Sequence, residues 1–106
     1  MKYDVLLKNC CLIDYATDFE GETDIAICDG VICEIGEELN TDCAGQAFDL
    51  KGAMVMPGII DTHVHASAWL GGGAGHKMLA LAGVTNALDM SGPGDSVLAL
   101  SKEQGV

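Results

Sequence analysis

The chain has 106 residues, enough for one small domain, and 49% of them are hydrophobic, which indicates a globular protein. Sixteen acidic residues against five basic ones give a formal net charge of −11. This balance disfavours nucleic acid and anionic membrane surfaces as partners, because both carry negative charge. No apolar run approaches the roughly 20 residues of a membrane span, and no signal peptide is evident. We therefore expect a cytoplasmic protein.

The first half of the chain has the pattern of short antiparallel strands. Residues 3–13 predict a strand with a break near Asn9, and residues 47–50 and 53–56 predict two short strands. The clearest signal is Asp29-Gly30 between two alternating apolar runs, which predicts a type I′ hairpin. This half therefore predicts a small sheet or half sandwich.

The hairpin fixes the relation between two of the five cysteines. A regular two-residue turn pairs Cys28 with Val31 and Ala26 with Cys33. Cys28 and Cys33 are then diagonal neighbours, roughly 7–8 Å apart, which exceeds the usual Cα span of a disulfide. Five cysteines are also an odd number at irregular spacing. We expect all of them to be reduced thiols.

The pattern changes after residue 53. A buried strand is predicted over 58–65, then a glycine-rich loop, a helix over 76–82 ended by Gly83, a strand over 84–90 and a helix over 96–104. Strand, helix, strand, helix is the order of a parallel α/β sheet, so the predicted fold class is α/β. The sequence thus divides into residues 1–53 and 54–106.

His63 and His65 are the candidate metal ligands. They lie two residues apart in a predicted strand, so both imidazoles project from the same face, together with Asp61. Two neutral imidazoles on a rigid strand can bind one divalent ion such as Zn²⁺. Such an ion would lower the pKa of a bound water and polarise a carbonyl. Taken alone, a His-x-His pair more often belongs to a surface or a core.

Residues 57–65 read PGIIDTHVH and resemble the opening motif of the amidohydrolase superfamily, a family of metal-dependent hydrolases. In that family the motif leads into the first strand of a distorted (β/α)8 barrel and ends in paired metal ligands. The upstream strands resemble the family's N-terminal β-sandwich segment, and residues 81–89 resemble the end of the first barrel helix and the second strand. The resemblance implies a β-sandwich segment over 1–53, followed over 54–106 by the first two βα units of a TIM barrel.

The resemblance also implies chemistry. It implies hydrolysis of an amide or other C–N bond of a small-molecule substrate. The attacking water would be activated on one or two divalent ions, with zinc the expected metal, held in part by His63 and His65. We expect a homo-oligomer. The loop after a barrel strand faces the active site, so Ser67, Trp69 and Gly72 are candidate substrate-binding residues. An equal alternative is that Trp69 packs under this loop and the glycines are only flexible.

The rest of the family's site cannot be matched. Its members add a lysine or glutamate, two further histidines and a catalytic aspartate. A complete barrel needs about 250 residues, and about 50 follow Pro57. We therefore expect a fragment or truncated product that contains no catalytic residue and no competent active site. His76 is expected to be solvated or to cap a helix, and Asp89 either contacts the site or serves a loop.

The sequence narrows the subfamily only in part. Dihydroorotases bind the substrate carboxylate with an arginine shortly after the second histidine, and this chain has no arginine. Residues 70–75 resemble the glycine-rich loop of isoaspartyl dipeptidases, but those enzymes carry a glutamate where Ala74 or Gly75 stands. Hydantoinase-like enzymes, N-acyl deacetylases and deaminases stay open. A different class also stays open, a non-catalytic β-rich interaction module. A cysteine-based zinc module is disfavoured because paired C-x₂₋₄-C spacing is absent.

Overall fold

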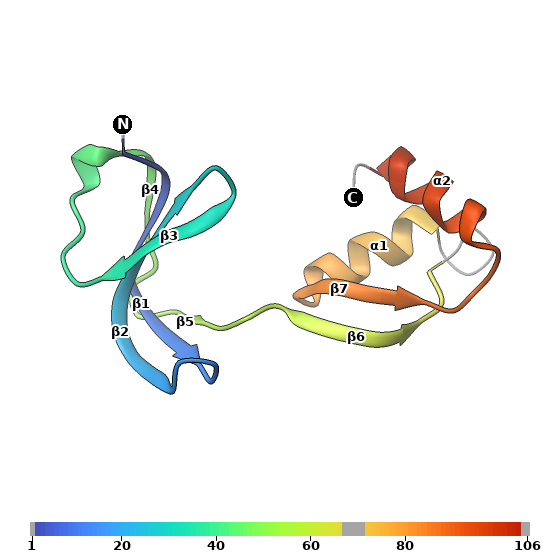
Figure 1. Ribbon diagram of the computed structural model, residues 1–106, viewed down its shortest axis with the longest axis horizontal. Helices are drawn as coiled ribbons and strands as arrows, with labels where there is room; N and C mark the ends of the chain where they lie inside the picture. The colour runs from blue at the N-terminus through green and yellow to red at the C-terminus, as the bar shows by residue number, and fades with distance from the viewer. Residues whose placement is uncertain (1, 67–71, 105–106) are drawn as a thin grey trace. The chain divides into compact units, whose positions relative to one another are not determined.

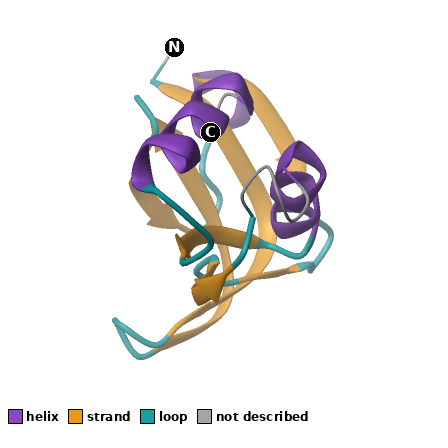
Figure 2. Ribbon diagram, turned by 90° about the vertical axis from the view of Figure 1, so that its right-hand side faces the viewer, coloured by secondary structure: helices purple, strands orange, loops and turns teal. Residues whose placement is uncertain are grey.

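The computed structural model describes residues 2–66 and 72–104. The chain forms two compact units, residues 1–57 and 58–106 (Figure 1). Strands supply most of the regular structure, and both α-helices of the described residues belong to the second unit (Figure 2). The predicted mixture of strands and helices is therefore confirmed.

The first unit is a single five-stranded sheet in the order β3-β2-β1-β4, with β5 also paired to β1. Its elements are β1 (Tyr3–Asp14), β2 (Phe19–Cys28), β3 (Val31–Gly36), the 3₁₀ helix η1 (Thr41–Cys43), β4 (Ala44–Asp49) and β5 (Met54–Val55). The first three strands are antiparallel, as predicted, but β4 and β5 run parallel to β1. The antiparallel prediction is wrong there because residues 37–43 cross back to the start of β1 before β4 begins.

A bulge at Asn9 interrupts β1, where the sequence predicts a break. Leu7 pairs with Ile25 and Cys10 pairs with Thr23, so β1 has one residue more than β2 between these pairs. Asn9 has a φ of 54°, in the left-handed region that asparagine tolerates better than most residues. The extra residue exchanges the faces to which the following side chains point.

The bulge gives the sheet an apolar cluster on each face. Consecutive residues of a strand point to opposite faces, so Ile25 and Ala26 belong to different clusters. One cluster contains Tyr3, Leu6 and Ala26, and the other contains Cys10, Leu12 and Ile25. Without the bulge, Cys10 and Leu12 would lie on the face of Leu6.

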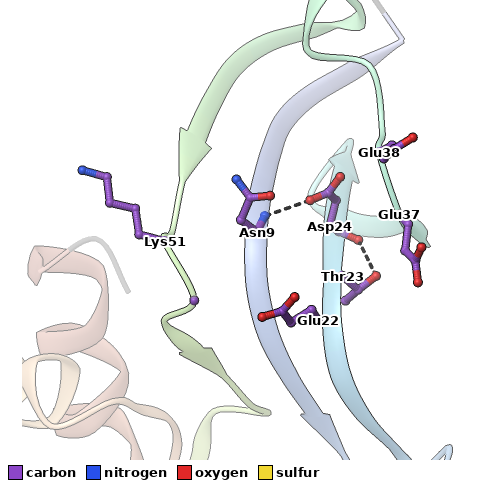
Figure 3. A pocket seen from close by; sticks show the side chains of 8 residues that line it. Asn9, Glu22, Thr23, Asp24, Glu37, Glu38 and Lys51 are labelled. Carbon is purple, nitrogen blue, oxygen red and sulfur yellow. Dashed lines mark hydrogen bonds between the residues drawn. The ribbon is translucent and has the colours of Figure 1, made fainter.

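The carboxylate of Asp24 holds this bulge in place. Its Oδ1 accepts a hydrogen bond from the Asn9 backbone N–H at 2.8 Å (Figure 3). Its Oδ2 accepts from Lys8 Nζ at 2.6 Å and from the Leu39 N–H at 2.9 Å. Burial acts to raise the pKa of Asp24, but these hydrogen bonds outweigh it and hold the pKa below its ordinary value. Asp24 is therefore a charged, fully bonded group inside the unit.

Replacing Asp24 by Asn should lower the free energy of unfolding of the first unit by about 3 kcal/mol, because Lys8 would lose its buried partner. The folded pKa is depressed, so the contribution of Asp24 is fully present above the unfolded value of about 3.9. It is lost as pH falls through the folded pKa. Urea unfolding followed by circular dichroism at several pH values measures both effects. Asp42→Asn, at an exposed position, is the control, and equal stability of the two variants would contradict the prediction.

The predicted hairpin between β2 and β3 is confirmed. Asp29 and Gly30 have φ values of 50° and 77°, as a type I′ turn requires. Cys28 pairs with Val31 across the turn, as the sequence predicts.

The pairing one step further along the hairpin differs from the prediction. Ala26 pairs with Glu34, so Cys33 is the extra residue of a bulge in β3. The bulge brings the Cα atoms of Cys28 and Cys33 to 5.8 Å, and their sulfurs form a disulfide. The prediction that these two cysteines stay reduced is wrong because it assumed a regular register. The other three cysteines are free, as predicted: Cys10, Cys11 and Cys43.

The second unit is a parallel β-α-β unit followed by a helix. Its elements are β6 (Ile59–Val64), α1 (Gly72–Leu81), β7 (Val84–Asp89) and α2 (Gly94–Gln104), and β6 pairs with β7 in parallel. Gly83 ends α1 with a φ of 80°, as predicted. The helix begins earlier than predicted, within the glycine run. Its first turns lie beside the end of β6, since a Cβ on Gly75 would lie 3.7 Å from the Cβ of Ala66, an ordinary van der Waals distance.

Gly58 marks a close approach between the start of β6 and β7. A Cβ at this position would lie 2.7 Å from the Cβ of Thr85 and closer still to its γ atoms. The Ile59 N–H donates to the Gly83 carbonyl at 3.0 Å, which fixes the spacing. The glycine of the motif therefore has a steric reason.

Gly58→Ala should destabilise the second unit by about 2 kcal/mol, since the added methyl group must push the two strands apart. Thermal unfolding of the variant and the parent chain measures this. Gly92→Ala is the matched control, because a Cβ there meets no atom within 4 Å. Equal transition temperatures for both variants would contradict the steric role of Gly58.

Candidate metal centre

His63 and His65 come together at the carboxyl end of β6. His63 lies within the strand and His65 directly follows its last residue. Their Nε2 atoms are 3.3 Å apart, and the two rings stack with centroids 5.3 Å apart and planes inclined by 19°. Both residues are exposed. The strand therefore presents two imidazole nitrogens side by side.

The spacing of these two nitrogens fits one metal ion. Two nitrogens bound to tetrahedral zinc at 2.0–2.1 Å are about 3.3–3.4 Å apart, and the pair spans 3.3 Å. Within residues 2–66 and 72–104, no third histidine, cysteine or carboxylate joins them to form a group that could hold an ion. The described residues thus bring together two imidazole nitrogens at this spacing, without a third ligand-type side chain beside them.

The side chain of Asp61 binds the backbone of its own strand. Its Oδ1 accepts a hydrogen bond from the N–H of His63 at 3.1 Å. This contact fixes the chain direction at the first histidine.

Asp89 ends β7 and holds the segment that follows β6. One oxygen accepts from the Ala66 N–H at 3.3 Å, and the other accepts from the backbone N–H of Ser91 at 2.8 Å and from its hydroxyl. The hydrogen bonds from Ser91 do most to hold the pKa of Asp89 below its ordinary value. Of the two roles left open by the sequence, the structure therefore shows the loop role, one residue away from His65.

His76 lies in the second turn of α1 because the helix begins at Gly72. It is half-buried, and its Nδ1 is buried without a hydrogen-bond partner among the described residues. An open cavity of about 400 Å³ adjoins it, lined by residues of β6, β7 and the two helices. The expectation that His76 caps the helix is therefore wrong, and its side chain is only partly solvated. The cause is the earlier start of the helix.

The candidate substrate-binding residues have different outcomes. Gly72 is the first residue of α1 and has a φ of 49°, which favours glycine. Ser67 and Trp69 lie outside the described residues.

The first unit has a groove of its own. It has a volume of about 360 Å³ and an acidic lining that includes Glu22, Glu37 and Glu38 beside Asp24 (Figure 3). The histidine pair belongs to the second unit, and the Asp24 carboxylate is already bonded to the bulge of β1.

The described helices include none long and apolar enough to cross a membrane.

Comparison with known proteins gives consistent likenesses. No family model matches the chain. An allantoinase of Bacillus licheniformis is 35% identical over 98 residues, which cover 85% of this chain and 21% of that enzyme. The chain spans about a fifth of the length of the curated relatives it matches.

Solved structures agree with the sequence relatives. An L-hydantoinase from Arthrobacter aurescens superposes with a TM-score of 0.70 and 28% identity over 97% of this chain and 25% of that one. An N-acyl-D-glutamate deacylase from Bordetella bronchiseptica was solved with zinc and a phosphonate inhibitor. It superposes with a TM-score of 0.69 and 27% identity over 84% of this chain and 19% of that one. Both comparisons lead to one class, hydrolases of the amidohydrolase type. The chain belongs to the amidohydrolase superfamily and corresponds to the N-terminal part of its members.

The histidine pair predicts weak but specific metal binding by the chain itself. His63→Ala and His65→Ala should each reduce the affinity for Zn²⁺ or Co²⁺ about tenfold or more, because one of two ligands is lost. His76→Ala removes the third histidine of the chain and should leave the affinity unchanged. Calorimetric titration and the Co²⁺ absorption spectrum measure the effect. Unchanged affinity in either strand variant would show that the pair does not bind the ion.

Proposed function

We propose that these residues form the metal-binding start of a hydrolase that cleaves an amide or other C–N bond. The observation that carries the proposal is the 3.3 Å separation of the His63 and His65 Nε2 atoms at the carboxyl end of a parallel strand. Active sites of (β/α)8 enzymes lie at that end of their strands. We take β6 and β7 as the first two barrel strands on this basis.

The two histidines would hold a divalent ion through Nε2. Each Nε2 must then offer its lone pair, so both rings carry their proton on Nδ1. Zinc suits such ligands, and the deacylase relative was solved with zinc. The ion, one or two per site, would supply a water of lowered pKa and a polarised carbonyl.

The neighbouring residues would keep this pair in place. Asp61 binds the backbone at His63, and Asp89 binds the backbone at Ala66, so both ends of the ligand segment are tied down. Ser67, Trp69 and Gly72 follow directly, and we propose that they line the pocket for a small-molecule substrate. We further propose a cytoplasmic homo-oligomer.

The substrate should resemble those that the relatives' names give. These are allantoin, hydantoins and N-acyl-D-glutamate. Each has a C–N bond to a carbonyl carbon, which an activated water can attack.

The test uses the longest product of the reading frame that contains these residues, loaded with zinc. His63→Ala and His65→Ala should each reduce turnover of an active substrate at least a hundredfold, because the water is no longer activated. Lys77→Ala changes an exposed residue of α1 and should leave turnover unchanged. Near-normal turnover in either histidine variant would contradict the proposed function. Absence of hydrolysis with every substrate would favour a non-catalytic interaction module.

A further inference from the structure

The bulge in β3 determines the positions of two neighbouring features, the Cys28–Cys33 disulfide and the carboxylate of Glu34. Cys33 is the extra residue of the bulge, and its insertion moves Glu34 to the position opposite Ala26. Paired residues share a face. Glu34 therefore lies on the face of Ala26 and Tyr3.

On that face Glu34 finds two partners from the start of the chain. Its Oε2 accepts a hydrogen bond from the Tyr3 hydroxyl at 2.7 Å and from Lys2 Nζ at 2.6 Å. In a regular register, Glu34 would pair with Ile25 and point to the opposite face, since a shift of one residue exchanges the faces. Both hydrogen bonds would then be lost. The bonds of Glu34 thus favour the bulged register.

The same register brings the two sulfurs together. Without the bulge Cys28 and Cys33 are diagonal neighbours at roughly 7–8 Å, whereas the bulge places their Cα atoms 5.8 Å apart. Anything that stabilises the bulge therefore favours the disulfide, and the disulfide favours the bulge by the same free energy.

The disulfide is also open to an attacking thiol. Cys33 is exposed, while Cys28 is half-buried and packs against the cluster of Tyr3, Leu6 and Ala26. Attack at the Cys33 sulfur is therefore the accessible route.

We propose that Cys28 and Cys33 form a reversible thiol–disulfide exchange site for low-molecular-weight thiols, and that Glu34 is its positioning residue. In reduction, the thiolate of a small thiol attacks the Cys33 sulfur and forms a mixed disulfide. The electron pair of the broken S–S bond leaves on the Cys28 sulfur, which takes up a proton. A second small thiol attacks the mixed disulfide, releasing the Cys33 thiol and the small disulfide. Oxidation by a small disulfide is the reverse sequence.

In the test, the full chain is equilibrated in buffers of reduced and oxidised glutathione. The free thiols are then trapped by alkylation, and the mass of the product is measured by mass spectrometry. The chain has five cysteines, of which three are free beside the disulfide. The mass should therefore change from three to five added groups as the buffer becomes more reducing. Cys33→Ser should show four groups throughout. Five groups, or three groups, at every glutathione ratio would overturn the exchange site, and so would any paired thiol in Cys33→Ser.

The positioning role is tested by the midpoint of the same titration. Glu34→Ala should reduce the equilibrium constant for disulfide formation about fivefold, the effect of losing a net hydrogen bond. Tyr3→Phe, which keeps the ring in the core, should also reduce this equilibrium constant. Glu37→Ala, in the exposed segment after β3, should not shift it. Circular dichroism verifies folding, and if Glu34→Ala unfolds, Tyr3→Phe decides. A midpoint equal to that of the parent chain in the folded variant overturns the role of Glu34.

Discussion

The buried carboxylate of Asp24 is the contact on which the first unit depends. One oxygen fixes the bulge of β1 through Asn9, and the other binds Lys8 together with the Leu39 N–H of the segment that leaves β3. A carboxylate bonded on both oxygens satisfies its charge without water, so it can be buried. It ties the crossover segment to the middle of β1, and the chain then continues to the beginning of β1, where the Lys2 N–H donates to the Cys43 carbonyl and Tyr3 pairs with Ala44. The parallel pairing of β4 with β1 follows from this.

The crossover before β4 and two bulges of one residue each account for the differences between the predicted and the observed first unit. Alternation of apolar residues has a period of two, and it predicts the strands, the Asp29-Gly30 turn and the break near Asn9 because these are local signals. A bulge is decided by bonds between distant residues, Asp24 with Asn9 and Glu34 with Tyr3. Asn9 indicates the position of the first bulge locally, but no local pattern contains these distant hydrogen bonds or the register that they favour. The disulfide was missed for the same reason, since one inserted residue changes the separation of the two cysteines.

The second unit was more predictable at its strands than at its helix. The run before His63 and the one after Gly83 predict the positions of β6 and β7 closely. The prediction that the first of these strands is buried is wrong, because among the described residues β6 pairs only with β7 and most of its residues are exposed, Ile59 to 49% and Ile60 to 63%. The start of α1 was not predictable, since glycine disfavours helix by about 1 kcal/mol per residue. The structure nevertheless begins the helix at Gly72, so its first turns lie beside Ala66. Because the helix starts earlier, His76 lies in its second turn beside the cavity and not at the first residue of the helix, as predicted.

The histidine pair was predictable because its geometry is almost wholly local. Two side chains at positions i and i+2 of one strand share a face whatever surrounds the strand, and the 3.3 Å between their Nε2 atoms arises within three residues. The surrounding carboxylates act on the backbone: Asp61 on the N–H of His63, Asp89 on that of Ala66. A short stretch can therefore set two imidazole nitrogens at the spacing that one metal ion requires. Any further ligand would have to come from another strand, and a motif of nine residues cannot specify how strands pair.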